Sequence, residues 1–326
     1  MSSAVRPARQ TDPVHKFFAW LIGLPPGLYM LLGLVVYFWF ASDTFFTVSN
    51  FQSVIRQSVP LMILAFGQTL IVLTQGTDLS LGMQASMVTV VWVALATAGV
   101  PIYVAAGLAV MCTVVIGSIN GLLVSKGKIP PFIATFGMQN IVMSTSLLIT
   151  GGASIYFYHP VFEFVMESHV WVIPTPVFIA MLAFALTWVL LYKTQFGTNI
   201  FGLGGNQEAL SLAGVSIAKA YVKTYAYTGF LAGICGLVTA CRVESGQPIV
   251  GMGWEFEAVA ATLLGGTSLR EGKGGVAGTI LGVLLLFVLR NGLNHVGVSA
   301  IYQNAIIGTV VMLAIVTDAL VRRYRD

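Results

Sequence analysis

Apolar residues fall in long, uninterrupted runs along this chain of 326 residues, and short polar connections separate the runs. The runs do not alternate apolar and polar positions in steps of two, which argues against a β-barrel. A helix needs about 20 apolar residues to cross a bilayer. By this measure the sequence predicts ten spanning helices, near residues 21–40, 54–73, 80–98, 102–124, 131–150, 171–191, 220–240, 254–268, 275–292 and 300–318.

The eighth predicted span, 254–268, is the weakest of the ten. It has about fifteen residues and would be about 22 Å long at the rise of an α-helix. It also carries Glu255 and Glu257 close to its start. We therefore expect either a full crossing or a half-helix at this position.

The composition is that of a chain whose solvent is lipid. Hydrophobic residues make up 57% of the sequence and charged residues 9%, whereas soluble domains have about 25% charged residues. A soluble chain of this length could not hide so much apolar surface. The sequence therefore predicts an all-α polytopic membrane protein.

The basic residues predict the orientation of the spans. If the N-terminus is inside, ten spans place thirteen of the sixteen Lys and Arg residues in the cytoplasm and only Arg56, Arg242 and Arg290 outside. Such a bias is typical of cytoplasmic loops. We expect both termini in the cytoplasm, with tails over 1–20 and 319–326 flanking a membrane domain over 21–318. These residues cluster at the chain ends and short connections, which fits orientation in a membrane better than binding to a nucleic acid.

Two connections are too long to be simple turns. The first, 151–170, is predicted to be periplasmic, and Glu163 and Glu167 would share a face of a helix there because they are four residues apart. Its aromatic residues would lie at the membrane interface. We expect a short helix or hairpin that docks a periplasmic partner, although a loop without a partner would have the same sequence. The second connection, 192–219, is predicted to be cytoplasmic.

The cytoplasmic connection contains the run Gly204-Gly205-Asn206-Gln207-Glu208-Ala209-Leu210-Ser211-Leu212-Ala213-Gly214. Small side chains let a short helix sit deep in a groove, and a glycine can end such a helix at positive φ. An acid near the helix start suits the helix dipole. An ordinary connecting helix between two spans would also fit this run.

Three further segments carry recognisable motifs. They are Gly76-Thr77-Asp78-Leu79-Ser80-Leu81-Gly82, then Gly251-Met252-Gly253-Trp254-Glu255-Phe256-Glu257-Ala258, and then Asn291-Gly292-Leu293-Asn294. Together with the cytoplasmic run, they resemble the ribose/xylose/arabinose-type permeases of ABC importers. In that family an acid, small residues and a glycine six positions later form the loop that presses into the ATPase. Leu210 departs mildly from the family pattern, as does Glu271.

The resemblance implies a ten-span subunit of the bacterial inner membrane that imports a monosaccharide of the ribose type or a related polyol. It also implies a second permease, a copy or a paralogue, a separate ATPase that holds ATP and Mg²⁺, and a periplasmic sugar-binding protein. Gly205, Asn206, Glu208, Ala209 and Gly214 would then form the ATPase coupling loop. No cofactor is expected in this chain, which has no phosphate loop.

Five polar residues are candidates for the pathway or for helix breaks: Asp78, Ser80, Glu255, Glu257 and Asn291. An acid beside a span is a functional candidate. Asp78 or Thr77 could instead cap the third span, and Glu255 and Glu257 could be ordinary first-turn acids that pair with Arg242 or Arg290.

A weak internal repeat is visible. Asn120-Gly121-Leu122 precedes Gly137 by the same spacing as Asn291-Gly292-Leu293 precedes Gly308. The separation would relate two inverted halves, although a chance match explains it equally well.

Two other function classes compete with an importer permease. A secondary transporter commonly has coupling acids or histidines within its spans, and the spans here are nearly free of charge. A membrane enzyme needs clustered catalytic residues or metal ligands, and the sequence offers neither. We therefore expect no catalytic or metal site and no ATP hydrolysis by this chain.

Overall fold

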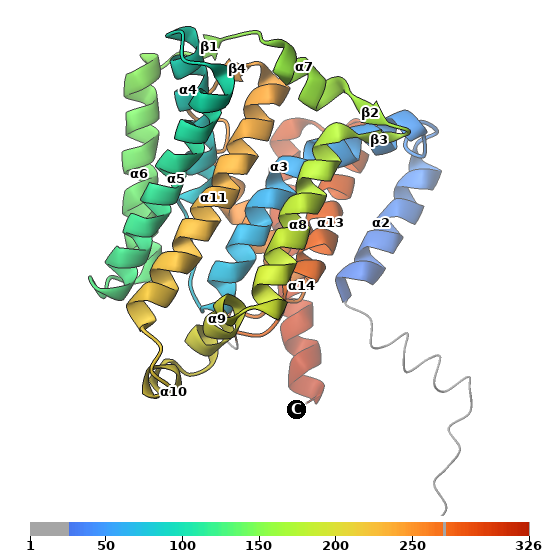
Figure 1. Ribbon diagram of the computed structural model, residues 1–326. Coiled ribbons are helices and arrows are strands. Elements are labelled where there is room, and N and C mark those ends of the chain that lie inside the picture. The colour runs from blue at the N-terminus through green and yellow to red at the C-terminus, as the bar shows by residue number, and fades with distance from the viewer. Residues whose placement is uncertain (1–25, 270–271, 326) are drawn as a thin grey trace, which may run out of the picture.

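The computed structural model describes residues 26–269 and 272–325, and most of its helices run between two opposite ends of the molecule (Figure 1). The helices are α2 (Pro26–Ala41), α3 (Val48–Leu73), α4 (Leu81–Thr97), α5 (Ile102–Ser125), α6 (Pro131–Thr150), α7 (Pro160–Glu167), α8 (Thr175–Lys193), α9 (Gln195–Gly205), α10 (Gln207–Leu212), α11 (Ile217–Val243), α12 (Trp254–Leu264), α13 (Val276–His295) and α14 (Ala300–Arg325). Four two-residue strands form two small antiparallel pairs: β1 (Ile155–Tyr156) with β4 (Ser245–Gly246), and β2 (His169–Val170) with β3 (Ile173–Pro174).

These helices confirm an all-α polytopic membrane protein. Within the described residues, six helices are long and apolar enough to cross a bilayer: α3, α5, α6, α8, α11 and α13. Helix α4 and the apolar parts of α2 and α14 are shorter. Helix α12 has only 11 residues, which corresponds to about 16 Å, so it has the length of a half-helix.

The C-terminal boundary of the predicted membrane domain does not coincide with the end of a helix. The predicted tail 1–20 and the first residues of the predicted span 21–40 lie outside the described residues. Helix α14 continues to Arg325, so residues 319–325 extend the last helix.

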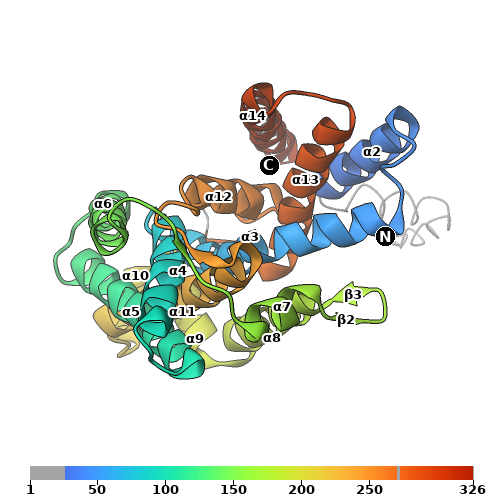
Figure 2. The same ribbon diagram turned by 90° about the horizontal axis from the view of Figure 1, so that it is seen from above.

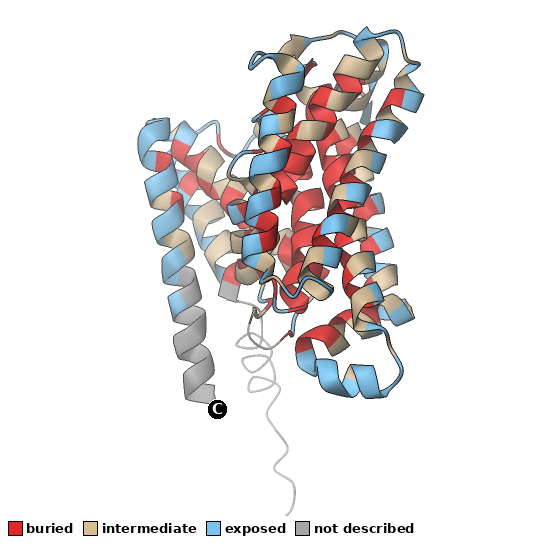
Figure 3. Ribbon diagram, turned by 90° about the vertical axis from the view of Figure 1, so that its left-hand side faces the viewer, coloured by how far each residue is buried: buried red, intermediate tan, exposed pale blue. Residues whose placement is uncertain are grey.

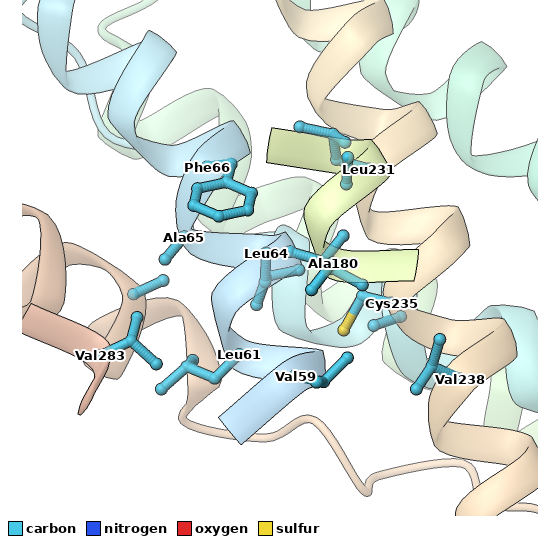
Figure 4. Packing of buried hydrophobic residues seen from close by; sticks show 14 of the residues in the cluster. Val59, Leu61, Leu64, Ala65, Phe66, Ala180, Leu231, Cys235, Val238 and Val283 are labelled. Carbon is cyan, nitrogen blue, oxygen red and sulfur yellow. The ribbon is translucent and has the colours of Figure 1, made fainter. Parts of the chain in front are cut away.

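Helix α3 occupies the centre of the bundle, between α12 and α13 on one side and α8 and α11 on the other (Figure 2). In its most apolar stretch 78% of the residues are buried, compared with 28% in α5, α6 and α8. Val59, Leu61, Leu64, Ala65 and Phe66 of α3 pack among residues of α8, α11 and α13 (Figure 4). The outer helices therefore present much of their surface to lipid, and exposed residues lie on the outward faces (Figure 3).

Small residues bring α5 and α11 into backbone contact. A Cβ at Gly117 would collide with the carbonyl oxygen of Tyr225, and a Cβ at Gly229 would collide with that of Thr113. Gly121 follows Gly117 by four positions, and Gly233 follows Gly229 by four. This spacing is typical of close helix pairs in membranes, and here it lets the main chains of α5 and α11 pack directly against each other.

The helix ranges repeat along the chain. The separation of Asn120 from Asn291 is 171 positions. A shift of 171 carries α3 onto 219–244, α4 onto 252–268, α5 onto 273–296 and α6 onto 302–321, which overlap α11, α12, α13 and α14.

The two long connections lie at opposite ends of the molecule (Figure 1). Residues 151–170 form β1, α7 and the start of the β2–β3 hairpin at one end. This agrees with the short helix or hairpin predicted for this connection. Residues 192–219 form α9 and α10 at the other end. The predicted short helix near Glu208 is confirmed as α10, whereas α9 was not predicted.

Candidate functional site

The chain breaks between α3 and α4, and the break carries Asp78. Residues 74–80 are not helical, and Asp78 and Ser80 are fully buried. One carboxylate oxygen of Asp78, Oδ1, accepts from Ser80 N at 2.9 Å and from Ser80 Oγ at 2.6 Å. The N-cap of α4 is Ser80, without a side-chain capping bond. Asp78 therefore bonds to the cap residue and is not itself the predicted cap, and neither is Thr77.

Amide side chains from two other helical positions converge on Ser80. Ser80 Oγ accepts from Gln84 Nε2 at 2.8 Å and from Asn120 Nδ2 at 2.9 Å. Three oxygens of this group find no donor among the described residues: Oδ2 of Asp78, Oε1 of Gln84 and Oδ1 of Asn120. The result is a buried polar cluster with spare hydrogen-bond acceptors, which we call the Ser80 cluster (Asp78, Ser80, Gln84, Asn120).

Neighbouring residues hold the main chain of the break. Leu79 N donates to Thr135 Oγ1 of α6 at 3.1 Å. The side-chain amide of Gln68, oriented to suit both groups, bonds to the carbonyl and N–H of Asp78 at 3.1 and 3.3 Å. The break is therefore tied to α3 and α6 as well as to α4 and α5.

A second break, before α12, packs against the first. Gly251 N donates to Ser86 Oγ of α4 at 2.8 Å. Gly82 and Gly251 approach so closely that a Cβ on either would collide with the carbonyl oxygen of the other. Two interrupted segments, distant in sequence, thus meet inside the bundle.

Glu255 lies at this meeting point and is 1% exposed. Its Oε1 accepts from Gln139 Nε2 of α6 at 2.9 Å and from Gly253 N at 3.3 Å. Oε2 of Glu255 and Oε1 of Gln139 are buried without a donor among the described residues. The Gln139–Glu255 pair therefore links α6 to α12 and keeps two acceptors unused.

Glu257 and Asn291 have different surroundings. Arg290 Nη2 donates to Glu257 Oε1 at 2.7 Å. Of the pairings left open between the two glutamates and Arg242 or Arg290, the structure therefore shows the one between Glu257 and Arg290. Asn291 lies inside the continuous helix α13 and marks no helix break. Its amide exchanges hydrogen bonds of 2.9 and 3.0 Å with that of Asn50, so it ties α13 to the start of α3.

Helix α10 projects from the end opposite α7, and none of its residues is buried. Asn206 begins it, with Oδ1 accepting from Ala209 N at 2.9 Å. Gly214 follows its end with φ of 81°, the left-handed conformation predicted for this glycine. Glu208 lies in the first turn, and Leu212 is 83% exposed.

The root of α10 is fixed to its neighbours. Gln207 Nε2 donates to Tyr221 OH of α11 at 2.7 Å. A Cβ at Gly202 would be 2.8 Å from Leu210 Cδ1, so Leu210 packs closely on α9. Helix α10 is therefore held at its base by α9 and α11, while its other residues project from the molecule.

Helix α7 covers the opposite end of the bundle. Phe162 and Met166 are buried beneath it, with the Phe162 ring 4.8 Å from that of Trp92. Glu163 and Glu167 are exposed. Tyr158 OH donates to Glu163 Oε2 at 2.6 Å, and this hydrogen bond raises the pKa of the Tyr158 phenol above its usual range.

The structure brings some predicted residues together and adds others. Asp78 and Ser80 join in one cluster and Glu255 lies against the neighbouring break, whereas Glu163 and Glu167 lie at the far end from Glu208. Gln84 and Gln139 were not predicted, although uncharged polar residues inside apolar spans are a usable signal. Within the described residues, no group of three or more His, Cys, Asp or Glu could hold a metal ion.

Comparison with known proteins gives one consistent family. Residues 50–316 match the family described as branched-chain amino acid transport system / permease component. The chain is 35% identical to the ribose import permease protein RbsC of Escherichia coli strain K12, covering 95% of this chain and 98% of that protein. It is 35% identical to RbsC of Bacillus subtilis strain 168 over 90% of each chain. Identity to the D-allose transport system permease protein AlsC of Escherichia coli strain K12 is 30%, over 91% of this chain and 92% of that one. No solved structure matches the chain significantly.

Proposed function

The chain belongs to the family of branched-chain amino acid transport system permease components, and on that premise we propose that it is the membrane-embedded permease subunit of an ABC importer for a ribose-type monosaccharide. The observation that carries this proposal is the 35% identity to a ribose import permease over nearly the whole of both chains. An allose permease is also similar, so the substrate class is a neutral sugar or a related polyol.

We place the chain in the bacterial inner membrane with ten spans and both termini in the cytoplasm. The ten predicted ranges each overlap one helix among α2–α6, α8 and α11–α14. The excess of basic residues in the predicted cytoplasmic connections supports this orientation. It puts α9 and α10 inside and α7 outside.

In this proposal helices α3–α6 and helices α11–α14 are the two halves of an inverted repeat. Asn50 of α3 bonds to Asn291 of α13, and the shift of 171 makes these positions equivalent to residues 221 and 120. Near that second pair, a Cβ at Gly121 would be 3.0 Å from the carbonyl oxygen of Tyr221. Contact between the start of one helix and the end of another therefore recurs with the roles exchanged, as in an inverted repeat.

The cytoplasmic ATPase docks on α10. A short, exposed helix with small residues can seat in a groove of a partner, and the exposed Leu212 supplies apolar contact. The acid Glu208 suits a basic residue on that partner. ATP and Mg²⁺ bind to the ATPase, so this chain receives movement and performs no ATP chemistry.

Two further partners complete the importer. A periplasmic sugar-binding protein docks over α7, where Glu163 and Glu167 offer exposed negative charge. A second permease, which is a copy or a paralogue, pairs with this chain in the bilayer.

The sugar passes the interrupted segments at the centre of the bundle. Sugar hydroxyls are hydrogen-bond donors, and the spare acceptors are Oε2 of Glu255 and Oε1 of Gln139. Separation of α6 from α12 would break the Gln139–Glu255 bond and expose both acceptors. Glu255 and Gln139 would then contact the substrate.

Reconstitution tests this function. The chain would be combined in liposomes with its ATPase, its binding protein and its second permease. Uptake of labelled ribose, allose and galactose would be measured with and without ATP. We expect ATP-dependent uptake of at least one neutral sugar, and uptake that is the same without ATP would refute the assignment.

A further inference from the structure

Helix α9 is seated directly against two membrane segments at one glycine. A Cβ at Gly204 would collide with the carbonyl oxygen of Leu73, the last residue of α3. The same Cβ would be 3.2 Å from Cα of Gly272, in the connection between α12 and α13. Gly204 and Gly272 are both buried. Three main chains therefore meet at a point where no side chain fits.

Gln75 adds a polar bond to the same contact. Its Nε2 donates to the carbonyl oxygen of Gly204 at 2.7 Å. Gln75 follows the end of α3 with φ of 61°, and Gly76 N closes the turn on Ile71 O at 3.1 Å. Glycine is the usual residue here because a side chain strains the left-handed conformation. A glutamine at this site accepts that strain and makes a bond that glycine could not make.

Helices α9 and α10 are joined at one residue, Asn206. Asn206 N donates to Gly202 O at 3.0 Å and so closes α9, while Asn206 Oδ1 accepts from Ala209 N at 2.9 Å and opens α10. One residue therefore caps both helices. Any displacement of α10 is carried to Gly204, which is two residues before Asn206.

The contact leads to both interrupted parts of the membrane domain. Gln75 is three residues before Asp78 and lies in the same break, residues 74–80, which carries Asp78 and Ser80 of the Ser80 cluster. Gly272 lies between α12, which carries Glu255, and α13. Movement at Gly204 would thus reach the first break directly, and the second break, at Gly251, through helix α12.

We propose that Gln75, Gly204 and Gly272 form the joint through which movement of the α9–α10 unit reaches the two interrupted segments of the membrane domain. Gln75 is a positioning residue in this joint, because it holds α9 to the break and touches neither substrate nor nucleotide. The proposal rests on the proposed function of the chain as an ATP-driven permease.

The test is the amount of sugar imported per ATP hydrolysed by the full reconstituted importer. Gln75→Gly removes the amide and relieves the strained backbone, so the permease should melt at the same temperature as the parent or higher. The import-to-hydrolysis ratio should fall about three- to tenfold, the range for one lost hydrogen bond. Stability and coupling would then change independently, which a merely structural residue would not allow.

A second pair of variants probes the glycine. Gly204→Ala should also lower the ratio because its methyl group strikes Leu73. Gly107→Ala, in α5 with no heavy atom within 4 Å of the added Cβ, should leave the ratio unchanged.

If the parent imports sugar and Gln75→Gly has the same import-to-hydrolysis ratio as the parent, the proposed joint is overturned. A Gln75→Gly variant that loses uptake only in proportion to lost stability would also overturn it. Failure of the parent importer itself would instead refute the proposed function.

Discussion

Gly214 determines at the scale of one residue how α10 ends. Its φ is 81°, its N–H closes the last turn on Ser211 O at 2.9 Å, and a Cβ there would meet nothing within 4 Å. Gly214→Val should therefore cost only backbone strain, about 1–2 kcal/mol. We expect normal insertion but about tenfold lower import per ATP, measured in the reconstituted complex. Gly214→Asn is the control, because asparagine tolerates the left-handed region. If the parent, Gly214→Val and Gly214→Asn all import the same amount of sugar per ATP, α10 is only a connection between two spans.

The Glu257–Arg290 pair offers a second prediction at this scale. The two side chains are 26% and 33% exposed and 2.7 Å apart. Glu257→Gln should lower the free energy of unfolding by about 1 kcal/mol, the upper range for an exposed pair. The measurement is a double-mutant cycle with Arg290→Gln by thermal unfolding in detergent. Additive losses from the two substitutions would mean that the pair contributes nothing.

Local residue patterns were predictable, and convergent ones were not. The left-handed Gly214 follows from a helix that must stop, which is a property of neighbouring residues. The Ser80 cluster depends on Gln84 and Asn120 reaching one hydroxyl, and Asn120 is 40 residues from Ser80. A contact between residues so far apart in the chain cannot be read from a single sequence. Asp78 was therefore considered as a cap of this span, whereas in the structure it bonds to the cap residue Ser80.

The pairing of α5 with α11 gives a prediction at the scale of elements. The two helices touch through Gly117 and Gly229, whose added Cβ atoms would strike opposing carbonyl oxygens. Gly117→Val and Gly229→Val should each destabilise the permease by about 1–3 kcal/mol through overpacking. Gly137→Val, on α6 with open space around the new Cβ, is the matched control. The measurement is the melting temperature in detergent, and equal melting of the three variants would refute the close contact.

Helix α10 carries a prediction about assembly. Leu212 is 83% exposed although it is apolar, and such residues favour a docking surface when they lie on a projecting element. Leu212→Asp should leave insertion and melting unchanged and weaken co-purification of the ATPase about tenfold, as expected for a buried anchor. The control is Ser211→Asp on the same short helix. A position such as Leu186 of α8 would not serve, because α8 faces lipid. Equal recovery of ATPase with Leu212→Asp and the parent would exclude Leu212 from the contact.

At the scale of elements, the hydrophobic runs predicted where most helices lie. The helix that they did not predict depends on tertiary contacts. The short α12 was anticipated because its apolar run is short. Helix α9 was missed because Gln195–Gly205 is rich in glycine, which disfavours helices. Backbone contacts stabilise it instead: a Cβ at Gly197 would collide with the Leu191 main chain, just as Gly204 packs on Leu73. These contacts are visible only once α3 and α8 are in place.

At the scale of the whole molecule, the order of helices was predictable but their depth in the bundle was not. In a bilayer the surroundings of an outer helix are as apolar as a protein core, so polarity does not separate inside from outside as it does in water. Helix α3 carries buried Gln68 and Thr69 and is central, whereas α5 is more apolar and largely lipid-facing. The buried polar residues were the better guide to the centre.

Docking on the outer end gives the last prediction, which concerns the assembled importer. Glu163 and Glu167 are exposed on α7, while Phe162 and Met166 fix the helix to the bundle. Reversing both charges with Glu163→Lys and Glu167→Lys should therefore spare the fold and repel a basic rim on the binding protein. Uptake should fall several-fold at low salt, and the deficit should shrink above about 0.15 M salt, where charges more than about 8 Å apart are screened. Glu244→Lys, at the end of α11, is the matched control for added positive charge on this end. Unchanged uptake by the double variant at low salt, with normal membrane expression, would remove α7 from the docking surface.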